Sequence, residues 1–294
     1  MPPFVSVGVP VYNGGSTLRV TLDSLTRQTY RNIEIIIADN CSLDQTESVC
    51  REYVQNDSRI RYVRHSKNIG ATENFKYLLS QATAKYFMWA AADDKRSDNF
   101  IEVNLGFLEE HPDYVASTCP DAFEGQEADV DNFRKFSLVG GGASRVLTFF
   151  KYCWVSHAMY YCLARTNALR KCPSLGSSFV AADWALILEL AKQGKLHRVN
   201  AGWILFGTGG VSNSPNAFKA FRNDALDIFL PMAKISRITI KLVKDFSFDE
   251  KIRIWIAVTK VNMRASVIQL TFLRHRFATF VKATLLQFGV KPKG

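Results

Sequence analysis

Residues 32–40 read NIEIIIADN, a nearly unbroken apolar run that ends on the carboxylate of Asp39. A strand with one solvated face would alternate between apolar and polar residues, whereas this run is apolar on both faces. Strands of this kind are typical of a parallel sheet that helices cover on both sides. The run therefore predicts an α/β fold with an interior sheet.

The same pattern recurs along the first 120 residues, where apolar strands and amphipathic helices alternate about four times. Strand–helix–strand units of this kind join parallel strands through right-handed crossovers. The alternation predicts a doubly wound, mostly parallel sheet flanked by helices. We expect strands at 4–11, 32–39, 59–63, 85–91 and 114–119, and helices that begin at a Ser16 N-cap and at 45–55, 72–81 and 98–110.

Carboxylates follow two of the expected strands. Asp39 ends the second strand, and Asp93 and Asp94 follow the fourth, within FMWAAADDKRSDNF. Ligands of parallel α/β sheets bind at the carboxyl ends of the strands. An anionic ligand at this edge would need a divalent cation, and Mg²⁺ or Mn²⁺ commonly bridges one or two carboxylates to phosphates. The alternative is an ordinary turn that leads into a helix, where Asp is also favoured.

The charge is distributed unevenly along the chain. The whole sequence has 37 Lys and Arg against 27 Asp and Glu; residues 219–294 carry 15 against 5, which leaves 22 against 22 in residues 1–218. All of the excess positive charge therefore lies in the last quarter. With 47% hydrophobic residues the chain is globular, and we divide it into residues 1–218, which contain the predicted sheet, and a basic region at 219–294.

The basic region has apolar and aromatic residues every three or four positions, with Lys and Arg between them. This spacing predicts two or three amphipathic helices, divided near residues 245–250 and near Arg274. One interpretation is a peripheral contact with an anionic membrane surface. The other is that the apolar stripes pack on the rest of the protein or on a second subunit. No nucleic-acid-binding module is recognisable, so we expect no nucleic-acid partner.

Several segments, taken in order, resemble the inverting family-2 glycosyltransferases of the GT-A fold, over roughly residues 4–212. VSVGVPVYNGGSTLRVTLDSLTRQTYRNIEIIIADNCSLDQT is similar to the family's opening nucleotide-binding segment, and HSKNIGATENF to the turn and helix that follow it. AAADDKRSDNF lies where the family has its D-x-D metal motif. AADWALILELAKQGKLHRV resembles the later segment that carries the catalytic base.

The resemblance implies a role for each matching residue. Asp39 would accept hydrogen bonds from the nucleotide base, in a pocket shared with Pro10, Val11 and Asn13. Asp93 would bind a divalent metal, Mn²⁺ or Mg²⁺, on the donor diphosphate, with Asp94 as a candidate helper. The sequence departs from the motif at its first Asp, where Ala91 stands.

The resemblance also implies that Asp183 is the catalytic base that deprotonates the acceptor hydroxyl. The residue precedes an amphipathic run, so we expect it at a helix N-terminus, where the helix dipole would lower its pKa. The alternative role is an ordinary N-cap.

Four further residues are candidates. Arg64 and Asn68 are expected to contact the donor, and His157 and Trp184 the acceptor. The competing interpretations are a solvated turn residue for Arg64 and a core residue for His157.

The resemblance implies a metal-dependent inverting enzyme that transfers a sugar from a nucleotide-sugar donor, a UDP-sugar, to a hydroxyl of a surface glycan or lipid-linked acceptor. The alternative is a membrane-associated scaffold that kept the fold without the chemistry. A dinucleotide oxidoreductase is excluded, because G-x-G-x-x-G is absent after the first strand, and the first turn lacks the basic residue that a nucleotidyltransferase would need. With no signal peptide and no long apolar run, we expect a cytoplasmic, peripheral protein; a homo-oligomer is left open.

Overall fold

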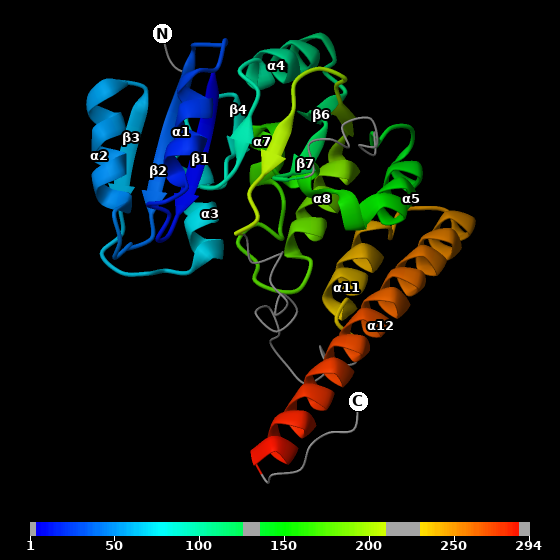
Figure 1. Cartoon of the computed structure of the whole chain (residues 1–294). Coiled ribbons are helices and arrows are strands. Elements are labelled where there is room, and N and C mark those ends of the chain that lie inside the picture. The colour runs from blue at the N-terminus through cyan, green and yellow to red at the C-terminus, as the bar shows by residue number, and fades with distance from the viewer. Residues whose placement is uncertain (1–3, 126–135, 210–229, 288–294) are drawn as a thin grey trace.

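The computed structural model of the chain describes residues 4–125, 136–209 and 230–287, with side chains up to Thr271. Its centre is a seven-stranded sheet with the order β3-β2-β1-β4-β8-β6-β9 (Figure 1). Every neighbouring pair is parallel except those of β8, which runs antiparallel to both β4 and β6. The strands are β1 (Val5–Val11), β2 (Ile33–Asp39), β3 (Ile60–Arg64), β4 (Tyr86–Trp89), β6 (Tyr114–Thr118), β8 (Leu163–Arg165) and β9 (Lys195–Arg198).

Helices cover both faces of this sheet, and each face has its own hydrophobic core. The predicted mostly parallel α/β architecture is therefore confirmed. The helices of the sheet region are α1 (Leu18–Thr26), α2 (Thr46–Asn56), α3 (Ala71–Gln81), α4 (Phe100–Glu110), α5 (Gly142–Tyr152), α6 (His157–Tyr160), α7 (Thr166–Arg170) and α8 (Ala182–Gln193), with the 3₁₀ turn Cys153–Val155 before α6.

Some boundaries differ from the sequence prediction. Strand β4 ends at Trp89, so Asp93 and Asp94 lie in a turn beyond the strand, in which the Asp94 amide donates to the Ala91 carbonyl over 3.2 Å. The first helix has Thr17 as its N-cap residue instead of Ser16, and no side chain caps it. The short strand β8 was not predicted, because three residues carry too little periodicity to show in a sequence.

A second, three-stranded sheet lies beside the first. It has the order β5-β10-β7, built from β5 (Lys95–Arg96), β10 (Ile204–Phe206) and β7 (Asp121–Phe123). Strand β10 is antiparallel to β5 and parallel to β7. This small sheet holds the turn after β4 against residues that are more than 100 positions later in the chain.

The basic region contains α11 (Ala233–Leu242) and α12 (Phe248–Gln287). Helix α12 packs against α5 and α11 against α8, and the C-terminal turns of α12 extend away from the sheet (Figure 1). The predicted break near residues 245–250 is present between α11 and α12. The predicted break near Arg274 is wrong, because α12 continues through that position as one helix. The proposed boundary at 218/219 lies outside the described residues.

Along the described ranges, no helix combines the length and the apolar content that crossing a bilayer requires. Helix α12 is long enough, but charged residues are spread along it.

Candidate functional site

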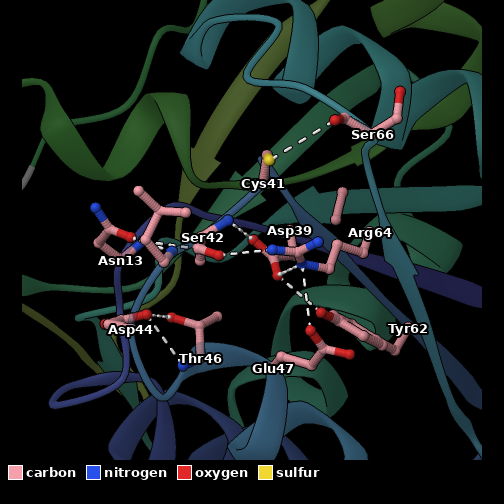
Figure 2. Close-up of polar contacts among 12 residues, drawn as sticks. Asn13, Asp39, Cys41, Ser42, Asp44, Thr46, Glu47, Tyr62, Arg64 and Ser66 are labelled. Atoms are coloured by element: carbon pink, nitrogen blue, oxygen red, sulfur yellow. Dashed lines mark hydrogen bonds and ion pairs between the residues drawn. The ribbon is translucent and has the colours of Figure 1, made fainter.

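Asp39 ends β2 as a fully buried carboxylate. Its Oδ1 accepts a hydrogen bond from the Ser42 amide over 2.8 Å, and its Oδ2 accepts one from the Tyr62 hydroxyl over 2.7 Å. The Arg64 Nε lies 3.4 Å from Oδ2 (Figure 2). Burial and the Asp39 carboxylate raise the pKa of Tyr62, so this hydroxyl remains a donor. The strand end thus has one carboxylate held by three neighbouring groups.

The turn after β1 is fastened to the loop after β2. Pro10 and Val11 are buried and pair with Ala38 and Asp39 across the two strands. Asn13, with a positive φ of 51°, donates its amide to Ser42 Oγ over 2.9 Å (Figure 2). Its side-chain oxygen accepts from the Leu43 amide, also over 2.9 Å. The predicted base-pocket residues therefore lie together at one edge of the sheet.

Asn68 is joined to the same edge through Asn40, which sequence reasoning missed. The Asn40 side-chain amide donates to Asn68 Oδ1 over 2.9 Å, and Asn40 Oδ1 accepts from the Ile69 amide over 2.8 Å. Arg64, in contrast, donates to the Ser42 carbonyl over 2.7 Å while its guanidinium approaches Asp39. Asn68 and Arg64, which were predicted to bind the donor, therefore both contact the loop after β2 in this structure.

We expect Asp39→Ala to weaken binding of a nucleoside diphosphate by about 5- to 150-fold, since a buried donor left without its acceptor costs about 1–3 kcal/mol. Isothermal titration calorimetry measures this directly. The variant should also melt at a lower temperature, because the Ser42 amide and the Tyr62 hydroxyl lose their acceptor. Tyr62→Phe is the matched control, which removes one internal donor and leaves the carboxylate. Unchanged affinity in a destabilised Asp39→Ala protein would make the residue purely structural.

The predicted metal residue Asp93 lies in the turn between β4 and β5, half-buried beside Gly207. A Cβ added at Gly207 would lie 2.5 Å from Asp93 Oδ2, so only glycine fits there. Asp93 and Gly207 line an open cleft of about 490 Å³, together with Ser16, Thr17 and Glu124. The aspartate carboxylate therefore faces a space that a ligand can enter.

Asp94 lies behind Asp93 and is almost completely buried. Its Oδ1 accepts from the Gly207 amide over 3.3 Å, and its Oδ2 lies 3.9 Å from Nη2 of the fully buried Arg96. Burial raises the pKa of Asp94 to about 7, although the Arg96 charge opposes this shift. Arg96 in turn donates to the Trp89 carbonyl over 3.0 Å. Asp94 thus connects the turn to β10 from inside the protein.

The donor set at this turn suits a divalent cation that arrives with a substrate. In the part of the chain that the structure describes, no group of three or more His, Cys, Asp or Glu is arranged as a complete metal site. Mg²⁺ and Mn²⁺ commonly take one or two protein carboxylates and complete their coordination with phosphate oxygens and water. Asp93 supplies such a carboxylate in an open cleft, so the residues present fit the group, with Ala91 contributing no ligand.

Asp183 lines a second cleft, of about 220 Å³, between α3, α6 and α8. Aromatic rings form much of its wall, including Phe75, Tyr160 and Tyr161, and His157 also lines it. The Tyr160 ring stacks on buried Trp89 with centroids 5.4 Å apart and an interplanar angle of 9°. The cleft therefore combines a carboxylate with an aromatic wall.

Asp183 lies in the first turn of α8, as expected from the sequence. The alternative role as the N-cap is wrong: α8 begins at Ala182, and the N-cap residue is Ala181, which has a positive φ of 67°. The expectation that its pKa lies below the ordinary value is also wrong. Burial raises the pKa of Asp183 to about 6, and backbone amide hydrogen bonds from the first turn only reduce that rise. Desolvation outweighs the dipole here because the carboxylate lies in a largely apolar cleft.

The pair Tyr160–Tyr161 lines the Asp183 cleft, and the Tyr161 ring lies 5.7 Å from that of Phe206, which lines the Asp93 cleft. Their rings are 5.2 Å apart and nearly perpendicular. Burial raises the pKa of both tyrosines; the charge of Asp183 adds to the effect on Tyr160, and the charges of Asp94 and Asp93 add to the effect on Tyr161. The two predicted catalytic regions therefore lie within electrostatic reach of one tyrosine pair.

The two predicted acceptor residues have different surroundings. His157 lines the Asp183 cleft and meets the Phe123 ring edge-on at 5.1 Å; burial lowers its pKa, so its imidazole is neutral at pH 7. Trp184 is 8% exposed and packs against Trp154 and Phe149, with ring centroids 5.1 and 6.1 Å away. Its ring supports the helix from within the core, because α8 directs successive side chains to different sides.

Sequence reasoning missed the groups that hold the turn containing Asp93 and Asp94. The Thr21 hydroxyl of α1 donates to the Ala91 carbonyl over 3.1 Å and to the Asp94 carbonyl over 2.8 Å. Gly207 and Arg96 complete this support. The sequence gives one local hint of the role of Arg96, which is its position two residues after the adjacent carboxylates. Basic residues in such positions are equally common on solvated surfaces, so the hint does not identify a buried arginine.

Comparison with known proteins identifies the family and the fold. The model of the family "Glycosyl transferase family 2" matches residues 6–169. An uncharacterised glycosyltransferase of Rickettsia typhi is 36% identical over 106 residues, which are 36% of this chain and 32% of that protein. Glycosyltransferase GlyG of Streptococcus pneumoniae is 36% identical over 103 residues, 35% of this chain and 34% of the relative. The putative teichuronic acid biosynthesis glycosyltransferase TuaG of Bacillus subtilis is 32% identical over 42% of this chain and 46% of its own. The matched segment thus spans less than half of each relative.

Solved structures share the fold at low sequence identity. The mannosyltransferase PcManGT from Pyrobaculum calidifontis, solved with GDP-Man and Mn²⁺, superposes with a TM-score of 0.61 at 16% identity, over 98% of this chain and 80% of that one. TarS residues 1–349 from S. aureus, solved with UDP-GlcNAc, gives 0.54 at 16% identity, over 86% and 79%. These likenesses confirm the predicted GT-A fold. Because the family model covers more than half of the sequence, the chain belongs to glycosyl transferase family 2.

Proposed function

We propose that this enzyme is a metal-dependent inverting glycosyltransferase, which moves a sugar from a UDP-sugar to a hydroxyl of a surface glycan or lipid-linked acceptor. One observation carries the proposal. Asp183, a carboxylate whose pKa burial raises, lines one cleft, and Asp93 lines a separate, open one. This reaction needs one site for the catalytic base and a separate site for the diphosphate of the donor.

Asp183 acts as the general base in this proposal. Its carboxylate takes the proton of the acceptor hydroxyl as that oxygen attacks the anomeric carbon, on the face opposite the leaving diphosphate, so that the configuration inverts. A pKa of about 6 keeps the group ionised at pH 7 and makes it more basic than an exposed aspartate. Asp93 would hold a divalent cation, which when bound neutralises charge that develops on the diphosphate.

The donor side is supported by the polar edge at Asp39. The hydrogen-bonding groups of this edge, at Asp39, Asn13 and Asn68, suit the nucleobase and the ribose of a nucleotide. The adjoining turn that contains Asp93 suits the diphosphate. The structural neighbour TarS was solved with UDP-GlcNAc and PcManGT with GDP-Man and Mn²⁺. These complexes support a metal and a nucleotide-sugar; UDP is our choice of nucleotide.

The acceptor side is supported by the aromatic wall of the Asp183 cleft. The rings of Phe75 and Tyr160 offer flat apolar surfaces, on which the C–H face of a pyranose can pack, and Asp183 supplies a hydrogen-bond acceptor beside them. This chemistry fits a sugar hydroxyl as the nucleophile. The relative TuaG is named as a putative teichuronic acid biosynthesis glycosyltransferase, and a glycan acceptor agrees with that name.

We also propose that the enzyme works as a peripheral protein on the inner face of a membrane. The support is the net charge of +10 that residues 219–294 carry, while residues 1–218 are neutral. Anionic lipid headgroups attract such a segment, and a lipid-linked acceptor would be presented at the same surface.

A non-catalytic scaffold is the competing proposal, and Ala91 in place of the first motif carboxylate favours it. Incubation with a panel of nucleotide-sugars, with and without Mn²⁺, separates the two. We expect slow Mn²⁺-dependent hydrolysis of one UDP-sugar, and faster turnover when an acceptor is added. Binding of nucleotide-sugars without any hydrolysis or transfer, over the whole panel and with every divalent cation tried, would favour the scaffold.

A further inference from the structure

Up to Thr271, where its side chains are described, helix α12 has one packed apolar face and one exposed apolar face. Ile254, Val258, Val261 and Ala265 are all less than 10% exposed and recur every three or four residues. They join the hydrophobic core that also contains residues of α5 and α8. This inner face fixes α12 to the sheet domain.

The opposite side of α12 is apolar and open to solvent. We call it the outer face and define it by its exposed apolar residues. At about 100° per residue, it is centred roughly 150° around the helix from the inner face. Exposed apolar patches on this scale are uncommon on a surface that meets only water. The outer face comprises Phe248 (77% exposed), Ile252 (42%), Trp255 (53%), Ile256 (51%), Met263 (64%), Val267 (62%) and Leu270 (56%).

Basic residues flank the outer face. Lys251 and Lys260 line a shallow open hollow of about 670 Å³ together with Phe248, Trp255 and Ile256. Over residues 230–271, eight Lys and Arg stand against three Asp and Glu. The surface thus has an aromatic and aliphatic centre with lysines at its sides.

We propose that the outer face of α12 is the surface by which the enzyme docks on an anionic lipid bilayer. An amphipathic helix with aromatic and aliphatic residues on one side and lysines beside them lies in the interfacial plane, with its apolar side among the upper acyl chains. Lysine stems extend along the apolar surface while their ammonium groups reach the headgroups. This inference rests on the proposed membrane association and assigns it to particular residues.

Charge decides between a bilayer and a second copy of the chain as the occupant. A dimer through the outer face would bring two basic regions together, each with a net charge of +10, and their repulsion disfavours it. An anionic bilayer is complementary to both the apolar centre and the lysine sides. Because the inner face is part of the domain core, docking would also fix the orientation of the sheet domain relative to the lipid.

The test uses the full-length protein and co-sedimentation with vesicles. One set contains phosphatidylcholine with roughly one third phosphatidylglycerol, and the other contains phosphatidylcholine alone. We expect binding to the anionic vesicles that weakens with added salt. The double variant Trp255→Ser with Ile256→Ser should bind at least about tenfold more weakly, and Lys251→Glu with Lys260→Glu should lose the preference for anionic vesicles.

Trp203→Ser is the matched control, since Trp203 is 40% exposed but lies just before β10, away from α12. It should bind vesicles like the unaltered protein. Melting temperature and hydrolysis of the donor sugar report whether each variant folds.

The outcomes are distinguishable. If the unaltered protein binds and the folded α12 variants bind equally well, the outer face is the wrong surface, while membrane association stands. If the unaltered protein binds no vesicles, the membrane association itself fails, and the glycosyl-transfer assay is unaffected. If gel filtration shows a dimer that the double variant converts to monomer, without vesicle binding, the occupant is a second copy and the proposal is overturned.

Discussion

Asp183→Asn should lower the rate of sugar transfer by about 10²–10⁴-fold, which is the usual contribution of general-base catalysis. The amide has the size of the carboxylate but cannot take the proton of the acceptor hydroxyl. Donor affinity should persist, because the Asp183 cleft lies apart from the polar edge at Asp39. Single-turnover rates with saturating donor and acceptor measure the first quantity, and calorimetry with UDP and Mn²⁺ measures the second.

Glu189→Gln provides the matched control on the same helix. Glu189 is 5% exposed, and its carboxylate accepts from the amide and the hydroxyl of Ser174 over 2.9 and 2.7 Å. The substitution removes a buried charge from α8 and leaves Asp183, the carboxylate that lines the cleft, unchanged. It should affect melting temperature more than the rate. If Asp183→Asn transferred sugar at the rate of the unaltered enzyme, the base would have to be another carboxylate.

The pH dependence of the rate follows from the pKa of about 6 that burial gives Asp183. Below pH 6 the group is protonated and cannot act as a base, so the rate should fall on the acid side with an apparent pKa near 6. This acid limb should be missing from the residual activity of Asp183→Asn. An acid limb with the same midpoint in both proteins would assign the titration to a different group.

The contribution of Asp183 to folding stability should change with pH in the opposite direction to the rate. The folded-state pKa lies above the value of about 3.9 for an exposed aspartate, so ionisation is harder in the folded state than in the unfolded chain. The contribution of Asp183 to stability therefore falls as the pH rises from about 4 to above 6. Asp183→Asn removes this cost. Its unfolding free energy should exceed that of the unaltered protein by about 1–3 kcal/mol at pH 8, and the gain should vanish near pH 4.

Asp93→Ala should remove Mn²⁺-dependent binding of a nucleoside diphosphate while leaving the fold intact. Loss of a residue that only supports a metal ligand typically costs about 10–100-fold in affinity, and loss of the ligand itself should cost at least as much. Titration of UDP in the presence and absence of Mn²⁺ measures the effect. Since Asp93 is half-buried and faces an open cleft, melting temperature should change little.

Asp94→Asn is the control in the adjacent position. Its carboxylate is buried and accepts from the Gly207 amide, so the amide variant should be destabilised by disturbing β10 and the pair with Arg96. Its effect on Mn²⁺-dependent binding should be smaller than that of Asp93→Ala. Equal loss in the two variants would show that both carboxylates serve the metal, and unchanged binding in Asp93→Ala would refute the site.

The sequence predicted best where the signal is local. Strand β2 and helix α2 were found within one or two residues, because a seven-residue apolar run and an eleven-residue amphipathic helix carry clear periodicity. Strands β5 and β10 were missed. They have two and three residues and exist only because Lys95 and Leu205, which pair across them, come together in the folded chain.

The prediction of the site was limited in a similar way. Their positions at strand ends followed from topology, so Asp39 and Asp93 were placed at the expected edge. The surroundings of each carboxylate did not follow. The burial that raises the pKa of Asp183 comes from side chains of α3 and α6, which are remote in the sequence, and no local pattern records it. Likewise, nothing near Asp94 shows that Gly207 donates to it.

The antiparallel strand β8 bears on how this chain acquires its structure during synthesis. β8 lies between β4 and β6, yet both of those neighbours precede it in the sequence. The block β3-β2-β1-β4 can form its hydrogen bonds as soon as it leaves the ribosome, whereas β6 has no partner until β8 emerges about 45 residues later. During that interval the free edge of β4 and both edges of β6 are exposed to other nascent chains. Slow translation of residues 119–162 should therefore favour aggregation over native yield, and ribosome-bound chains stalled before Leu163 should be protease-resistant only through β4.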